Sequence, residues 1–159
     1  MYKNKLFSGF KDVIELGSQN LQADGNDLAF IINKISDNQK VKNGTIKNAK
    51  DFYLSLGFLK YSCIDPDQRH DSLNLDLNEN LSNQGFFKKY ELITNFGTSE
   101  HCFDQNNCFT NIHNLCEVGG IMIHGVHFQG ALNEGFINYQ PNFFFCLASA
   151  NNYEILGVY

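Results

Sequence analysis

The chain alternates two patterns of hydrophobic positions, one of short apolar runs and one of helical spacing. The short runs are rich in Val, Ile, Leu and Tyr, which predicts β-strands. They lie at Val13–Leu16, Tyr61–Ile64, Leu73–Leu75, Tyr90–Thr94, Ile121–Ile123 and Tyr153–Val158. Because several of these runs are separated by segments of helical periodicity, the sequence predicts an α/β protein.

Four segments place apolar residues three and four positions apart, which predicts helices. These segments are Leu28–Ile35, Ile46–Leu56, Cys108–Cys116 and Asn142–Ala148. Asn26 or Asp27 is the expected N-cap of the first helix. Gly57 is expected just after the second helix, and Gly119-Gly120 are expected to stop the third.

Strands that alternate with helices predict a Rossmann-like three-layer α/β sandwich with a mainly parallel central sheet, built as one domain over residues 1–159. The passage from Ile64 to Leu73 is too short for the crossover that joins parallel neighbours. We therefore expect Leu73–Leu75 to be short or loosely paired. Hydrophobic residues make up 43% of the chain and aromatic residues 14%, which is typical of a globular protein.

Charge and hydropathy exclude several classes of protein. The formal charge of −5 and the pI near 5.4 argue against binding to nucleic acid or to an anionic membrane. The longest uncharged apolar run, 143–150, is too short to span a bilayer, and residues 1–10 contain no signal-peptide core. We expect a soluble, cytoplasmic protein.

The five cysteines are odd in number and include no CxxC pair, so we expect buried free thiols in a reducing compartment. They are Cys63, Cys102, Cys108, Cys116 and Cys146.

Polar residues gather where the predicted strands end. Those ends are Glu15–Gln19, Asp65–Asp67, Asp76–Asn78, Asn95–His101 and His124–His127. Acids and amides are poor strand formers, and ligands of doubly wound sheets bind beyond the carboxyl ends of the strands. The pattern therefore indicates a polar ligand.

The residue types narrow the ligand. Asp65 can accept both hydroxyls of a ribose, and Asp76 can accept from the exocyclic amine of adenine. Glu15 can accept from an ammonium group, Gly17 lets a ligand approach the backbone, and the N–H groups of residues 17–20 can hold a carboxylate. Together these groups describe S-adenosylmethionine. The remaining predicted cofactor-binding residues are Ser18, Gln19, Leu77, Asn95 and Gly97.

Five segments resemble, in order and rough spacing, the motifs of the class I S-adenosylmethionine-dependent methyltransferase superfamily. They are "VIELGSQ", "YSCIDPD", "LNLDLNE", "YELITNFGTSEH" and "LCEVGGIMIH". The resemblance covers about Asp12 to Phe128. It implies a seven-stranded sheet ordered 3-2-1-4-5-7-6 and methyl transfer to an O or N nucleophile of a small-molecule or glycan acceptor.

The sequence departs from the family pattern in two places. The glycine loop keeps Gly17 but has Gln19 where a second glycine often sits, so we expect a different loop or weaker cofactor binding. No sequence follows the predicted strand Tyr153–Val158 to form the antiparallel strand of the family. Either Tyr153–Val158 pairs directly with Ile121–Ile123, or the chain is truncated; we expect that C-terminal strand to be missing by truncation.

A base assists methyl transfer when the acceptor is a hydroxyl, and histidine titrates in the suitable range. His101, just after a predicted strand, is the first candidate, with Glu100 placed to orient it. His124 and His127 are the alternatives. The structural alternative is that His101 caps the following helix and that Glu100 is a solvated acid at the start of that helix.

Zinc is not expected, although His and Cys residues recur between positions 101 and 127. Cys108, Ile112 and Cys116 share one apolar helical stripe, as core residues do. An aromatic segment after the strand Ile121–Ile123 forms either a wall for the acceptor or a cap over the sheet. Its members are Phe136, Tyr139 and Phe143.

Two other functions fit parts of the pattern. An NAD-dependent oxidoreductase also uses an acid after its second strand, but the chain has no G-x-G-x-x-G segment. A degenerate methyltransferase fold that acts as a non-catalytic binding subunit is favoured by the lost glycine and the short C-terminus.

Overall fold

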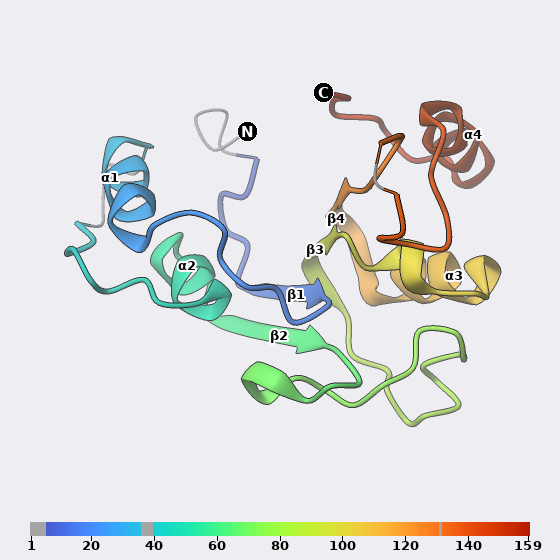
Figure 1. The fold of residues 1–159 in the computed structure, drawn as a ribbon, viewed down its shortest axis with the longest axis horizontal. Helices are drawn as coiled ribbons and strands as arrows, with labels where there is room; N and C mark the ends of the chain where they lie inside the picture. The colour runs from blue at the N-terminus through green and yellow to red at the C-terminus, as the bar shows by residue number, and fades with distance from the viewer. Residues whose placement is uncertain (1–5, 36–39, 131) are drawn as a thin grey trace.

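The computed structural model describes residues 6–35, 40–130 and 132–159. Within these residues, strands form one all-parallel sheet in the order β2-β1-β3-β4 (Figure 1). The strands are β1 (Asp12–Leu16), β2 (Lys60–Ile64), β3 (Tyr90–Phe96) and β4 (Cys116–Gly125). The chain leaves β1 toward β2 and returns on the other side of β1 as β3. This reversal opens a crevice at the carboxyl ends of β1 and β3.

Helices cover both faces of the sheet. They are α1 (Gly25–Ile35), α2 (Ala49–Ser55), α3 (Gln105–Leu115) and α4 (Pro141–Asn151). Successive strand residues point to opposite faces. Val13 therefore packs with Tyr53 of α2, whereas Ile14 packs with Ile112 of α3. The result is the predicted layered α/β architecture, compatible with a Rossmann-like fold.

Local capping explains where the helices begin. The carboxylate of Asp24 accepts a hydrogen bond from the N–H of Asn26 at 2.7 Å, so α1 begins at Gly25, earlier than expected. The side chain of Asn48 caps α2 in the same way, and Gly57 follows that helix with φ +102°. The expected glycine stop after α2 is confirmed.

The loose pairing expected for Leu73–Leu75 is confirmed, because the segment forms only a single bridge, between Ile64 and Leu73. Two other expected elements differ in the structure. α3 ends at Leu115, and Gly119-Gly120 lie inside β4 instead of stopping the helix. Tyr153–Val158 forms no strand: the Tyr153 hydroxyl is hydrogen-bonded to His113 Nδ1 of α3 at 2.6 Å, and the residues that follow Tyr153 are exposed.

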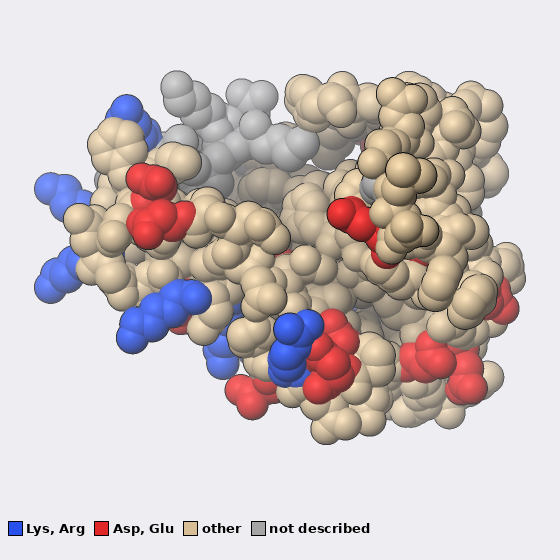
Figure 2. Space-filling view, in the orientation of Figure 1, with Lys and Arg blue, Asp and Glu red and all other residues tan. Residues whose placement is uncertain are grey.

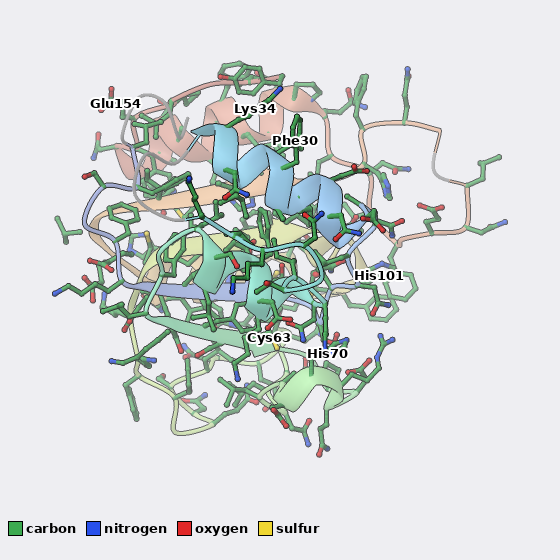
Figure 3. The ribbon with its side chains drawn as sticks, turned by 90° about the vertical axis from the view of Figure 1, so that its left-hand side faces the viewer. Phe30, Lys34, Cys63, His70, His101 and Glu154 are labelled. Carbon is green, nitrogen blue, oxygen red and sulfur yellow. The ribbon has the colours of Figure 1, made fainter. Side chains whose placement is uncertain are left out.

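Positive charge is confined to one part of the chain, because all 12 Lys and Arg residues precede Tyr90. Figure 2 shows most of the blue side chains toward the end of the molecule that holds α1 and α2, and mostly tan and red atoms over α3 and α4. Figure 3 views the first of these ends face-on, with Phe30 and Lys34 on α1. None of the described helices has the length and apolarity needed to cross a bilayer.

Candidate functional site

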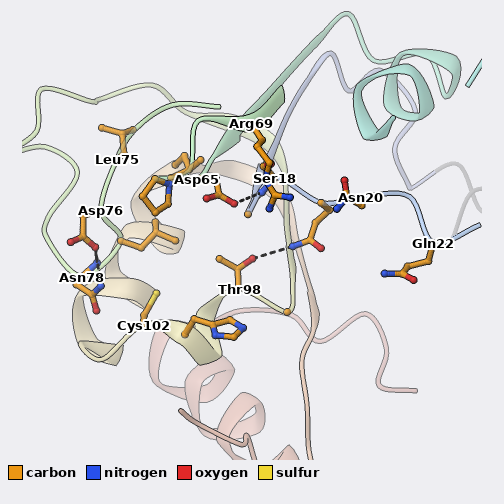
Figure 4. A pocket seen from close by; sticks show the side chains of 17 residues that line it. Ser18, Asn20, Gln22, Asp65, Arg69, Leu75, Asp76, Asn78, Thr98 and Cys102 are labelled. Carbon is orange, nitrogen blue, oxygen red and sulfur yellow. Dashed lines mark hydrogen bonds between the residues drawn. The ribbon is translucent and has the colours of Figure 1, made fainter. Parts of the chain in front are cut away.

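A cavity of about 400 Å³ opens at the carboxyl ends of β1, β2 and β3 (Figure 4). Eight of the eleven predicted site residues line it: Gly17, Ser18, Gln19, Asp65, Asp76, Leu77, Gly97 and His101. They come from loops far apart in the sequence, which the parallel sheet brings to one edge. The three predicted residues that do not line the cavity are Glu15, Asn95 and Glu100.

Asp65 joins the loop after β1 to the turn after β2. Its Oδ2 accepts from the N–H of Ser18 at 2.8 Å, and its Oδ1 accepts from the N–H of Asp67 at 3.0 Å. A carboxylate oxygen has two lone pairs, so each oxygen retains capacity for a ligand hydroxyl. The side chain of Ser18 is buried beside it, and its Oγ has no hydrogen-bond partner among the described residues.

Position 17 favours glycine for two reasons: its backbone has a positive φ, and neighbouring side chains occupy the space that a Cβ would need. Its φ is +79°, and a Cβ at this position would lie 2.4 Å from Thr98 Oγ1. Thr98 donates to the carbonyl of Leu16 at 2.7 Å and accepts from Gln19 Nε2 at 3.4 Å. Side chains of the protein therefore make the close approach that the sequence assigned to a ligand. Thr98 was not predicted as a site residue, because its position directly after Gly97 was the only sequence signal that pointed to it.

Asp76 is fixed on the opposite side of the cavity. Its Oδ1 accepts from both the N–H and the Nδ2 of Asn78 at 2.8 Å, and its backbone is hydrogen-bonded to the side chain of Gln84. The Oδ1 of Asn78 in turn accepts from the N–H of Asp104, the N-cap of α3. The predicted adenine-side acid is thus supported by the start of α3.

Glu15 lies on the α2 face of β1, because strand alternation places it on the same side as Val13. It is 3% exposed, and the hydroxyl of Tyr61 donates to its Oε2 at 2.7 Å. Burial raises the pKa of Glu15 to about 7, although the hydrogen bond from Tyr61 opposes the shift. Its side chain faces the core, so the structure does not bring Glu15 to the cavity where the predicted contact with an ammonium group would lie.

Asn95 is fully buried on the other face of the sheet. Its Nδ2 donates to Ser99 Oγ at 2.8 Å and lies 3.1 Å from Nδ1 of His124, the residue opposite it on β4. Burial lowers the pKa of His124 to about 4, so its Nδ1 is a neutral acceptor. Asn95 also accepts from the N–H of Ser99 and holds that turn, so the structure does not place it on the cavity with the other predicted cofactor residues.

The predicted pair of Glu100 and His101 is separated. Both belong to the 3₁₀ turn η3 (Ser99–His101), but His101 lines the cavity whereas Glu100 is 0% exposed. Oε1 of Glu100 lies 3.4 Å from Nδ1 of His127, and Nε2 of His127 lies 3.4 Å from Oε2 of Glu134. Because neighbouring residues of a turn point in different directions, Glu100 faces His127 instead of His101.

The aromatic segment after β4 divides between rim and core. Phe136 is half exposed, stacks on Phe103 with ring centroids 4.3 Å apart, and meets the edge of His101. Tyr139 and Phe143 pack against Phe109 of α3 as a core cap. In the part of the chain that the structure describes, no three His, Cys, Asp or Glu side chains are grouped to hold a metal ion.

Besides Asn78 and Thr98, seven lining residues were not predicted as site residues: Asn20, Gln22, Ile64, Pro66, Arg69, Leu75 and Cys102. Arg69 follows the turn after β2, and its Nε is paired with the carboxylate of Asp67. The polar loop "DPDQRHD" was the available signal for Arg69. The charged side chains on the lining are therefore two acids, Asp65 and Asp76, and one cation that already has a partner.

Comparison with models of known protein families, with curated proteins and with solved structures finds no match to this chain.

Proposed function

We propose that the cavity binds S-adenosylmethionine and that the chain is a class I type methyltransferase, acting on an O or N nucleophile of a small-molecule or glycan acceptor. The observation that carries this proposal is the convergence of eight predicted cofactor and base residues on one cavity at the reversal of strand order. The order β2-β1-β3-β4 also agrees with the run 2-1-4-5 in the strand order that the sequence resemblance implies.

The residues on the lining suit the parts of that ligand. Asp65 can receive the ribose hydroxyls, and Asp76 with Leu77 can receive the adenine. The buried hydroxyl of Ser18, which lacks a partner in the described structure, offers a further polar contact for the ligand. Two acids and a paired Arg69 suit a sulfonium cation better than the diphosphate of NAD, which needs donors or free positive charge.

The chemistry asked of the protein is mainly positioning. S-adenosylmethionine supplies a methyl group on a sulfonium whose leaving group is a neutral thioether. The cavity must hold donor and acceptor in line, and such alignment lowers a barrier by roughly 7–11 kcal/mol in favourable cases. His101, exposed at the rim, can take the proton of a hydroxyl acceptor.

Calorimetric titration tests the proposal. The chain is expected to bind S-adenosylmethionine and its demethylated product, S-adenosylhomocysteine, and not NAD. Binding of NAD alone would support the oxidoreductase instead. If none of the three binds, the proposal is wrong.

A non-catalytic nucleoside-binding subunit is the second candidate, and the separation of Glu100 from His101 favours it. A screen of metabolites and glycans with methyl-labelled donor distinguishes the two. Transfer of label to any acceptor supports the enzyme, whereas tight binding without transfer supports the subunit.

A further inference from the structure

A second cavity lies at the amino-terminal edge of the sheet, opposite the first. It has a volume of about 190 Å³ and lies where β3 begins and α3 ends. The loop between β2 and β3 passes beside α3 there (Figure 1). The two cavities share no lining residue. The side chains that give the second cavity its chemistry are those of Asn80, Phe86, Phe87, Lys88, Lys89 and Asn114.

The floor of the second cavity is fixed by the buried side chain of Asn111 on α3. Its Oδ1 accepts from the N–H of Leu81 at 3.0 Å. Its Nδ2 donates to the carbonyls of Leu77 and Glu79 at 3.1 and 2.8 Å. These three bonds tie the loop to the helix, so the cavity is already formed without a ligand, as most small-molecule sites are.

Two lysines give the second cavity a positive charge that no acid on its lining offsets. Among the described residues, the ion pairs of Lys and Arg involve Lys60 and Arg69. Lys88 and Lys89 therefore have no carboxylate partner there. The Lys88 ammonium lies 4.5 Å from the centre of the Tyr90 ring, a contact that positions the charge without neutralising it. In a chain of net charge −5, two such cations on one cavity favour an anionic ligand.

The other lining groups suit a flat ligand that carries oxygen atoms. Phe87 is 75% exposed and Phe86 is half-buried, so an aromatic ring can stack against this wall. The Oδ1 of Asn80 accepts from the N–H and the hydroxyl of Ser82 at 2.9 and 2.7 Å, which leaves its Nδ2 to donate to a ligand. Asn114 adds a second side-chain amide to the lining.

We propose that the second cavity binds a small aromatic phosphate, with the ring against Phe87 and the phosphate between Lys88 and Lys89. Lysine is a common phosphate ligand, and it acts as a point charge. Sites for drug-sized ligands measure about 300–1,000 Å³, so a volume of about 190 Å³ limits the ligand to one ring with its phosphate. Because the cavities share no lining residue, this inference stands apart from the proposed function.

The alternative role for the two lysines is structural, because the carboxyl end of a helix attracts cations and α3 ends beside this cavity. In that case Lys88 and Lys89 stabilise the helix alone. Replacing them then lowers the stability of the chain, and no aromatic phosphate binds at this place.

An NMR titration of the ¹⁵N-labelled full chain with phenyl phosphate tests the site. The side-chain amide signals of Asn80 and Asn114 are expected to shift until the site is saturated. Inorganic phosphate and phenol are each expected to bind at least tenfold more weakly, because each provides only half of the contacts. If these amides do not shift at millimolar phenyl phosphate, or if inorganic phosphate binds as tightly, the inference is overturned.

Variants assign the two halves of the ligand. The double variant Lys88→Gln/Lys89→Gln is expected to bind phenyl phosphate at least tenfold more weakly. Phe87→Ala should lose affinity for phenyl phosphate and keep that for inorganic phosphate. The matched control is Lys47→Gln/Lys50→Gln, which removes the same charge from exposed residues beside and on α2. An equal loss in both double variants would reflect net charge alone and would overturn the site.

Discussion

At the scale of single residues, the position of an acidic residue relative to its strand decides whether its carboxylate lies at the sheet edge or in the core. Asp65 comes after the last residue of β2 and is at the sheet edge, whereas Glu15 is inside β1 and points into the core. The sequence pattern marked both as strand-end acids. Only the alternation of side chains within β1 separates them, and a shift of one position reverses the face.

Asp65→Ala is expected to lower the affinity for S-adenosylhomocysteine at least tenfold, about 1.4 kcal/mol. The substitution removes the acceptor proposed for the ribose and also frees the N–H of Ser18. Calorimetry measures the change, and the matched control is Asp67→Asn, since Asp67 lies in the same turn but does not line the cavity. Equal affinity of Asp65→Ala and the unchanged chain would contradict the ribose role.

Thr98→Val tests the bridge over Gly17. Valine keeps the shape of threonine but loses the hydroxyl that donates to Leu16 and accepts from Gln19. We expect the free energy of unfolding to fall by about 1 kcal/mol in urea titration. Thr110→Val on α3, where the side chain makes no hydrogen bond in the described structure, is the control. A similar loss in both variants would show that the bridge contributes nothing specific.

At the scale of elements, hydrophobic periodicity predicted which helices and central strands form, but it did not always predict the residue at which each one ends. The central apolar strands and the four helices were predicted because their patterns report burial, which the structure also obeys. The boundary between α3 and β4 was missed because Cys116 continues the helical stripe and yet pairs with Tyr90 as the first residue of β4. Pairing with β3 overrides the helical periodicity at Cys116. Gly119-Gly120, which were expected to end the helix, lie instead at an irregularity of β4 where its pairing register with β3 shifts.

Gly120→Ala is expected to destabilise the protein by roughly 2 kcal/mol. A Cβ there would lie 2.8 Å from Cys116 Sγ and 3.0 Å from the carbonyl oxygens of Glu91 and Glu117, so β4 must shift from β3. Gly119→Asn is the matched control, because a Cβ there meets nothing within 4 Å and asparagine tolerates its φ of +83°. Urea unfolding measures the stability of both variants. If Gly120→Ala were as stable as Gly119→Asn, the crowding around position 120 would be contradicted.

At the scale of the whole molecule, the sheet positions one cavity at its edge and encloses ionisable groups on its faces. The position of the cavity was predictable, because parallel strands end at one edge and the chain reverses direction beside β1. The pairing of Glu100 with His127 was not, because it depends on how the loop after β4 folds back onto η3. Two N–H groups of that loop, from Phe136 and Ile137, donate to the Glu100 carbonyl and fix this return.

Glu15 and His124 titrate with opposite effects on stability. The pKa of Glu15 is raised from 4.5 to about 7, so its contribution is present below pH 4.5 and is lost as pH rises through 7. The pKa of His124 is lowered from 6.5 to about 4, so its contribution is present above pH 6.5 and is lost as pH falls through 4. Each shift corresponds to about 3 kcal/mol. Between pH 4.5 and 6.5 the folded state holds one extra proton on Glu15 and one fewer on His124, and the two slopes cancel.

The single variants should expose this cancellation. In Glu15→Gln only the His124 effect remains, so the free energy of unfolding is expected to rise by up to about 3 kcal/mol from pH 4.5 to 6.5, relative to the unchanged chain. In His124→Gln the free energy of unfolding should fall over the same pH range. The double variant should regain the pH profile of the unchanged chain, because it lacks both of the opposing contributions. Glu154→Gln, on the exposed C-terminal segment, controls for the loss of a carboxylate. Urea titrations at half-unit pH steps measure these slopes; parallel profiles for Glu15→Gln and the unchanged chain would mean that burial on the α2 face does not control the protonation of Glu15.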